Sequence, residues 1–183
     1  MSDLTTLANV KGWLNITTNG DDAVLQRMIS SVSQYVQSWL NRSLLSASYT
    51  EKRSGTGTHS MALSNYPIRS IASLVIDGVT IPASTDGIQS GYMFDERMLY
   101  LVGYTFTPRL LNVAISYTAG YAVVPPEIEQ AVIDTLSLRY RERTRIGEVS
   151  KSMGGETVSF SQKDFSDSAK TILNNYRKVV SVI

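Results

Sequence analysis

The residue types that carry nucleophilic, acid–base and metal chemistry are scarce in this chain. There is one histidine, His59, and there is no cysteine. A missing thiol excludes a cysteine nucleophile, a thiolate metal site and a disulfide, and one imidazole cannot form a two-histidine metal site. A Ser-His-Asp triad would have to use His59, which lies between an expected turn and a short strand, and the chain has no Gly-x-Ser-x-Gly elbow. We therefore expect no catalytic residue, no cofactor and no metal site.

Paired carboxylates could act as a general acid and a general base, but each pair has a local structural explanation. The pairs are Asp21/Asp22, Asp95/Glu96, Glu127/Glu129 and Asp164/Asp167. These positions suit helix caps, turns and the positive ends of helix dipoles. The glycine spacings Gly55-x-Gly57 and Gly154-Gly155 lack the Lys-Ser/Thr of a phosphate-binding loop and the strand-to-helix setting of a dinucleotide fold. The sequence thus predicts a protein that is not an enzyme.

The dense charge cluster of the chain is the run Arg139-Tyr140-Arg141-Glu142-Arg143-Thr144-Arg145. Arginines at every second position point both ways around a helix, which disfavours a single face that reads a DNA groove. Three interpretations stay open: solvated charges, contacts to carboxylates of another subunit, and contacts to DNA phosphates. The balance of 17 basic and 16 acidic residues gives no global attraction to nucleic acid or to an acidic membrane.

Composition and length bound the class of protein. Charged residues form 18% of the 183 residues, below the roughly 25% of typical soluble domains, which suggests that a partner covers part of the surface. No run approaches about 18 apolar residues, and the N-terminus has no basic region followed by an apolar one. We therefore expect one domain, residues 1–183, without a membrane span or a signal peptide.

Two helices are expected before residue 46. Thr5 or Thr6 can cap a short helix. Its apolar face would carry four residues: Leu7, Val10, Trp13 and Leu14. Asp21 or Asp22 begins a longer helix that reaches Leu40, and its apolar residues fall within about 140° at 100° per residue. The opposite face is polar and carries one charge: Gln26, Arg27, Ser30, Ser33, Gln34, Gln37 and Ser38. Such a face is either simply exposed or packs against another subunit through hydrogen bonds.

A β-rich insertion is expected between residues 46 and 121, where helical periodicity disappears and Gly, Ser, Thr and β-branched residues become frequent. Asp77-Gly78 is a favoured two-residue hairpin turn. Alternation of apolar and polar residues and turn signals predict seven strands: Ser46–Arg53, His59–Leu63, Ile71–Ile76, Val79–Ile81, Tyr92–Phe94, Met98–Val102 and Leu111–Tyr117. The fold class predicted is α+β, a small helical bundle with an inserted antiparallel β subdomain.

The third expected helix begins at Val124-Pro125-Pro126-Glu127 and ends near Gly147. Its apolar arc of about 220° is typical of a helix packed on more than one side. Arg139 and Glu142 continue the core stripe, so we expect its last turns to leave the core. Ser166 caps a fourth helix. The expected organisation is a helical segment 1–45, the β-rich insertion 46–121, a central helix 122–146, a mobile loop or loose hairpin 147–164, and a C-terminal helix and tail 165–183.

Several stretches together carry a resemblance to a known family. They are Leu4–Leu14, the helix Asp21–Leu40, Ser116-Tyr-Thr-Ala-Gly-Tyr121, Val124-Pro-Pro-Glu-Ile-Glu-Gln-Ala-Val132 and Leu138-Arg-Tyr-Arg-Glu-Arg143. In this order they resemble the tailed-phage head–tail connector family, also called head-completion adaptors, over nearly the whole chain. The segment 46–106 is longer and richer in strands than in the smaller, mostly helical members of that family.

The resemblance implies a structural, non-enzymatic virion protein. Members of the family form a ring of about a dozen copies beneath the portal of a filled head, extend the DNA channel and offer a surface to the tail or to a stopper protein. The implied partners are further copies of the chain, the portal, the tail or stopper and, weakly and without sequence preference, the genomic DNA. The implied locations are the virion and, during assembly, the host cytoplasm.

Contacts to neighbouring subunits and to the portal are expected from the end of the central helix, the loop that follows it and the polar face of the long helix. The candidate residues are Arg139, Arg141, Glu142, Arg143, Arg145, Lys151, Phe160, Lys163, Gln34 and Gln37. The alternative function is a DNA-binding accessory protein of phage DNA packaging, which would use the arginine run.

Overall fold

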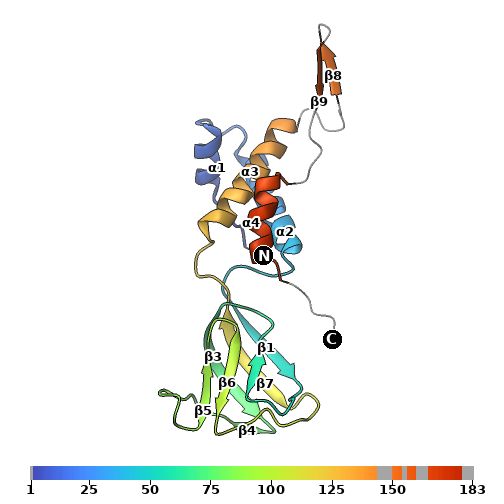
Figure 1. The fold of residues 1–183 in the computed structure, drawn as a ribbon. Helices are drawn as coiled ribbons and strands as arrows, with labels where there is room; N and C mark the ends of the chain where they lie inside the picture. Colours follow the sequence, from blue (N-terminus) through green and yellow to red (C-terminus); the bar gives the residue numbers. More distant parts are fainter. Residues whose placement is uncertain (1, 144–149, 154–155, 160–164, 179–183) are drawn as a thin grey trace. The chain divides into compact units, whose positions relative to one another are not determined.

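The computed structural model describes residues 2–143, 150–153, 156–159 and 165–178 (Figure 1). The chain forms two compact units. Residues Met1–Ser43 and Val124–Ile183 make the helical unit, and residues Leu44–Val123 make the β unit. The first unit contains the helices and a short two-stranded hairpin, and the second contains antiparallel sheets, so the expected α+β class is confirmed.

Four helices build the described part of the helical unit: α1 (Leu7–Leu14), α2 (Asp22–Trp39), α3 (Pro126–Glu142) and α4 (Asp167–Tyr176). Two of their caps are those expected. The Thr6 hydroxyl accepts the Asn9 backbone N–H at 3.2 Å, and the Ser166 hydroxyl accepts the Ala169 N–H at 3.1 Å. Helix α3 ends at Glu142, earlier than expected, and Arg145 lies outside the described residues.

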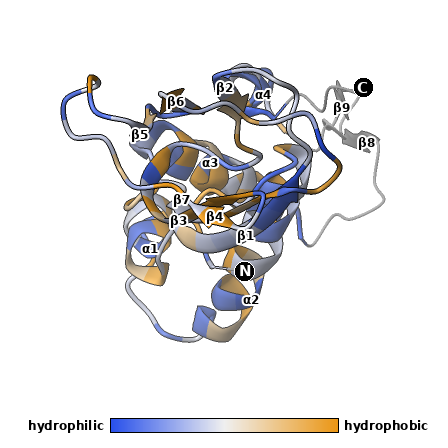
Figure 2. Cartoon of the chain, turned by 90° about the horizontal axis from the view of Figure 1, so that it is seen from below, coloured by the Kyte–Doolittle hydropathy of each residue, from blue (hydrophilic) through white to orange (hydrophobic). Residues whose placement is uncertain are grey.

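Helix α3 lies at the centre of the helical unit, because it contacts α1, α2 and α4. Its position agrees with the wide apolar arc in its sequence. The fully buried aliphatic side chains of this unit come from all four helices: Val10, Leu25, Ile29, Val36, Ile128, Val132, Leu136 and Leu173. The colouring of α2 alternates between hydrophilic and hydrophobic, as an amphipathic helix requires (Figure 2). One residue expected in this core is not there: Trp13 is 55% exposed.

The polar face of α2 is partly covered by the N-terminal segment of the same chain. The Ser33 hydroxyl accepts the Leu4 backbone N–H at 2.9 Å, and the Gln37 side-chain amide donates to the Ser2 carbonyl at 3.2 Å. Both side chains are buried. The expectation of an outward-facing Gln37 is therefore wrong, because residues 2–4 pack on this part of the helix. Gln34 stays exposed.

The β unit holds a four-stranded and a three-stranded antiparallel sheet, in the orders β1-β7-β3-β4 and β2-β6-β5. The strands are β1 (Ala47–Arg53), β2 (Ser60–Ala62), β3 (Ile68–Ile76), β4 (Val79–Thr80), β5 (Gly91–Phe94), β6 (Met98–Val102) and β7 (Val113–Ala119). Every second residue of β7 is buried, as its alternation predicts. Leu111, expected to begin this strand, precedes it and is 57% exposed.

Two glycine-containing turns shape the β unit. Asp77 and Gly78 have φ of 51° and 82° and join β3 to β4, which confirms the expected hairpin. Gly55 is needed for another reason: a Cβ atom there would collide with the backbone carbonyls of Phe106 and Thr107. The spacing Gly55-x-Gly57 thus reflects close backbone packing within the chain.

The segment between α3 and α4 contains a described hairpin of two short strands, β8 (Ser150–Met153) and β9 (Glu156–Ser159). Ser150 pairs with Ser159 and Met153 pairs with Glu156. A hairpin is one of the two structures that the sequence predicts for this segment, but the sequence prediction places it around Thr157–Phe160 and the observed pairing lies earlier in the chain. Lys151 lies in β8, whereas Phe160 and Lys163 lie outside the described residues.

Candidate assembly surface

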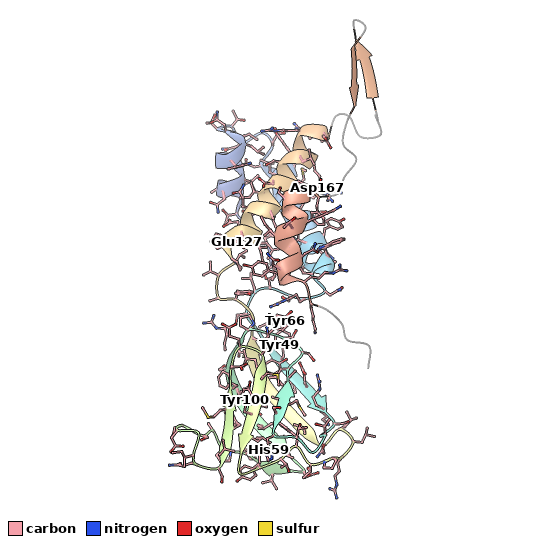
Figure 3. The ribbon with its side chains drawn as sticks, viewed as in Figure 1. Tyr49, His59, Tyr66, Tyr100, Glu127 and Asp167 are labelled. Atoms are coloured by element: carbon pink, nitrogen blue, oxygen red, sulfur yellow. The ribbon has the colours of Figure 1, made fainter. Side chains whose placement is uncertain are left out.

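The side chain most open to a catalytic interpretation, His59, has a structural setting. It lies at one end of the β unit, opposite Tyr66 (Figure 3). It is exposed, and its Nδ1 lies 2.9 Å from the Tyr104 carbonyl oxygen. His59 and Asp77 both line a hollow on the β unit. The Asp77 carboxylate accepts hydrogen bonds from Thr107 and Asn112, and these bonds hold the pKa of Asp77 below its usual range. Among the residues that the structure describes, His59 therefore has no carboxylate partner and forms no triad.

The carboxylates that occur in pairs serve local structure. Asp95 accepts the backbone N–H groups of Arg97 and Met98, at 2.7 and 2.8 Å, and these bonds lower its pKa. Asp22 forms an ion pair with Lys11 at 2.7 Å. Within the described residues, no three His, Cys, Asp or Glu side chains gather as a metal site would need.

None of the described helices combines the length and the apolar character needed to cross a bilayer.

The arginine run divides between opposite sides of α3. Residues two apart on a helix are separated by 200°, so Arg139 and Arg141 face opposite ways. The Arg139 guanidinium lies over the Tyr35 ring, 4.8 Å from its centroid. Arg143 lies 3.9 Å from the centroid of the Tyr140 ring. Arg141 is exposed and has no hydrogen bond or ion pair to a described residue. Two of the predicted interface arginines thus contact their own chain, and Arg141 is available to another molecule.

Asp21, the residue before α2, also contacts the last turn of α3. Its carboxylate accepts a hydrogen bond from the Tyr140 hydroxyl and lies 3.7 Å from the Arg143 guanidinium. The bond to Asp21 raises the pKa of the Tyr140 phenol. Asp21 therefore fastens the last turn of α3 to the start of α2 instead of bonding the N–H groups of its own helix.

An aromatic stack joins α2 to the residues that precede α4. The rings of Tyr35 and Phe165 are stacked with centroids 4.8 Å apart, and Trp39 meets Phe165 edge-on at 5.6 Å. Arg139 covers one end of the stack and Arg177 covers the other, 4.9 Å from the Trp39 ring. Phe165 is fully buried at its centre. Sequence reasoning missed Phe165, because a single aromatic residue before a helix cap carries no periodicity.

Hollowed surfaces lie on the described part of the helical unit, and two of them matter here. The first, here called the cationic groove, has a volume of about 510 Å³ and lies over α2; its lining is Ala23, Val24, Arg27, Met28, Ser31, Val32 and Arg139. The second, here called the tryptophan groove, consists of two hollows of about 550 and 510 Å³ that share Trp13. Its floor is the outward side of α3, including Gln130, Asp134 and Ser137, and α1 and the start of α4 border it.

The sequence-predicted interface residues fall at different places on this unit. Arg139 lines the cationic groove, and exposed Gln34 follows Arg27 by seven residues on the same side of α2. Arg141 lines the tryptophan groove. Glu142 is half-buried and has no hydrogen bond or ion pair to a described residue. Trp13, Arg27 and Asp134 were not among the predicted residues. The exposed tryptophan could not be recognised from sequence, because its helical spacing is that of a core residue.

Comparison with known proteins identifies the family. Residues 3–179 match the family model of the head completion protein. No protein of curated function matches the chain.

Three solved structures share its fold. A chain in the neck of an empty gene transfer agent (GTA) particle, computed with C6 symmetry, is 16% identical, with a TM-score of 0.60 over 98% of this chain and 92% of that one. A chain of the native GTA virion is 17% identical, with a TM-score of 0.57 over 99% and 96%. A chain in the native GTA neck, computed with C12 symmetry, is 15% identical, with a TM-score of 0.56 over 99% and 96%.

The match to the family extends through both the helical unit and the β unit, since residues 3–179 include all helices and strands described above. The long insertion at 46–106 is thus contained within the family match. The chain belongs to the head completion protein family and is a structural head–tail connector protein.

Proposed function

We propose that the chain is a ring-forming head–tail adaptor. In this role it docks on the portal, extends the DNA channel and presents the surface to which the tail or a stopper protein attaches. The observation that carries the proposal is the family match over residues 3–179. The likeness in fold to chains from GTA necks solved with C6 and C12 symmetry supports a ring, because closed rotational symmetry requires identical copies around one axis.

The exposed apolar side chains of the helical unit favour a role in assembly over a role in catalysis. Trp13 and Val24 expose 55% and 44% of their surface, on helices whose other apolar side chains are largely buried. Large apolar side chains that open onto hollows are typical of surfaces that a partner covers. The protein would be made in the host cytoplasm and incorporated into the virion at the neck.

Ring formation can be tested directly on the purified chain. We expect native mass spectrometry and electron microscopy to show closed rings of about a dozen copies when the chain is mixed with a portal. The chain alone is the matched control, since it reveals whether the portal templates the ring. A chain that stays monomeric and unbound in the presence of a folded portal would contradict the adaptor proposal.

The alternative, a DNA-binding packaging accessory, is favoured by exposed Arg141 but weakened by the positions of Arg139 and Arg143. Arg139 stacks on Tyr35 and Arg143 on Tyr140, so the arginine run offers fewer unoccupied cations than its sequence suggests. A channel wall must also let DNA pass, and each phosphate that a cation neutralises adds affinity and slows passage.

DNA affinity separates the two functions. We expect weak binding without sequence preference that vanishes at physiological salt, because 16 acidic residues balance the 17 basic ones and because the affinity gained from counterion release falls steeply with salt. Fluorescence anisotropy with two duplexes of unrelated sequence, across a salt series, measures this. Nanomolar binding that prefers one sequence would favour the packaging accessory and contradict a passive channel wall.

A further inference from the structure

We propose that neighbouring copies in the ring meet through the two grooves, with Trp13 of one copy inserted into the cationic groove of the next. The inference rests on the proposed ring and names the surfaces that would form it. The partner is thus a second copy of this chain, and the contact joins two different faces of the helical unit.

The two grooves lie on opposite sides of α3. Arg139 lines the cationic groove, whereas Ser137 and Arg141 line the tryptophan groove. Arg139 is two residues from each of them, which places it 200° away around the helix. A subunit of a closed ring must present two different faces, one to each neighbour, and two grooves on opposite sides of one central helix meet that requirement.

Trp13 and Gly12 point to a close contact at the tryptophan groove. Trp13 is 55% exposed although it follows the apolar spacing of α1. Gly12, beside it, lines the same groove, and a Cβ atom there would meet nothing within 4 Å. Glycine weakens a helix relative to alanine, and packing within the chain does not require it here. A second molecule that approaches α1 closely explains both residues.

The cationic groove has the chemistry that an indole ring needs. Val24, Met28 and Val32 supply apolar walls, and the Arg27 and Arg139 guanidinium groups border them. Cations favour the face of an aromatic ring, and tryptophan is the strongest partner for such contacts. Arg27 has no hydrogen bond or ion pair to a described residue, so its charge is available to a neighbour.

Charges on the two grooves are complementary. The cationic groove carries Arg27 and Arg139. The tryptophan groove carries Glu129 and Asp134, which accept hydrogen bonds only from uncharged side chains in the described part of the protein. Arg141 lies at the end of the tryptophan groove and reduces its negative charge without cancelling it. Opposite charge across a contact orients the copies and selects one register.

Cysteine cross-linking tests the contact, because the chain has no cysteine of its own. Ala8→Cys places a thiol at the tryptophan groove and Ser31→Cys places one at the cationic groove. With a bismaleimide linker of roughly 10 Å, the double variant is expected to give a ladder of covalent multimers, since every copy then offers both halves of the contact. Each single variant is expected to stay uncross-linked. A ladder missing from the double variant, or dimers from either single variant, would overturn the inference.

Two charged variants give a second, independent readout. Trp13→Glu damages the tryptophan groove and Arg27→Glu damages the cationic groove, and both side chains are exposed, so melting temperatures should stay near that of the wild type. Each variant alone is expected to lose rings by at least about tenfold. An equimolar mixture should recover pairs, because each partner keeps one intact face, but no rings. Normal rings in either variant would overturn the face assignment and leave the adaptor role standing, whereas absence of wild-type rings on a portal would count against the adaptor itself.

Discussion

Particles assembled without this chain are expected to have DNA-filled heads that lack tails, and infectivity is expected to fall to background. If the chain is a head–tail adaptor, DNA is packaged into the head before the adaptor completes the neck, so the head should still fill with DNA. The tail would then not attach, because in the proposed role the adaptor ring, and not the portal, supplies the attachment surface. Electron microscopy of particles from a host carrying a deletion of the gene, together with a count of infectious or transducing particles, measures both effects.

Complementation separates loss of the chain from effects on neighbouring genes. The wild-type chain supplied from a plasmid should restore tailed particles, whereas Trp13→Glu should not. Tailed, infectious particles in the deletion strain without complementation would remove the adaptor assignment altogether.

Replacement of Phe165 by alanine is expected to detach α4 from the helical unit. Phe165 is fully buried between Tyr35 and Trp39, and its removal leaves a cavity at the centre of the aromatic stack. Phenylalanine-to-alanine changes in a core cost about 3–5 kcal/mol. Because the buried side chains of α4 itself are only Ala169 and Leu173, the loss of Phe165 just before the helix lowers the local stability of the helix.

Hydrogen exchange of the α4 amides measures the effect on that helix. At about 1.4 kcal/mol for each factor of ten, exchange should accelerate by roughly a hundredfold or more. Phe94→Ala is the matched control, since Phe94 is 38% exposed in the β unit and the same truncation there should leave α4 unchanged. Unaltered α4 exchange in Phe165→Ala would show that the stack does not hold this helix.

Many elements could be predicted because their signals are local. The turn Asp77-Gly78 requires a positive φ at both residues, which aspartate and glycine tolerate, and the structure has φ of 51° and 82° there. Ser166 and Thr6 cap their helices through bonds that span three residues. The strands of the β unit followed from alternation along short segments, although β3 begins at Ile68, before the expected Ile71. The residues that shape such elements are neighbours in sequence.

The assembly surface could be predicted only in part. Helical spacing correctly placed Gln34 on the outer side of α2, but the same spacing placed Gln37 there, and residues 2–4 cover it. The arginine run was visible as a cluster, whereas its division between Tyr35, Tyr140 and open solvent depends on which helices lie beside α3. Trp13 matched a core position, yet no segment of the described chain covers it.

The α+β class, the position of the β-rich insertion and the helix and turn signals can all be recognised in the amino-acid sequence, as can the likeness to head completion proteins, which the match over residues 3–179 confirms. Which sides of the helices stay open, and so which residues can meet a neighbour, became known only from the folded chain. The period of a helix depends on bonds between residues four apart, whereas burial of a given face depends on which distant segment packs against it. Trp13 and Gln37 exchange their expected roles for that reason.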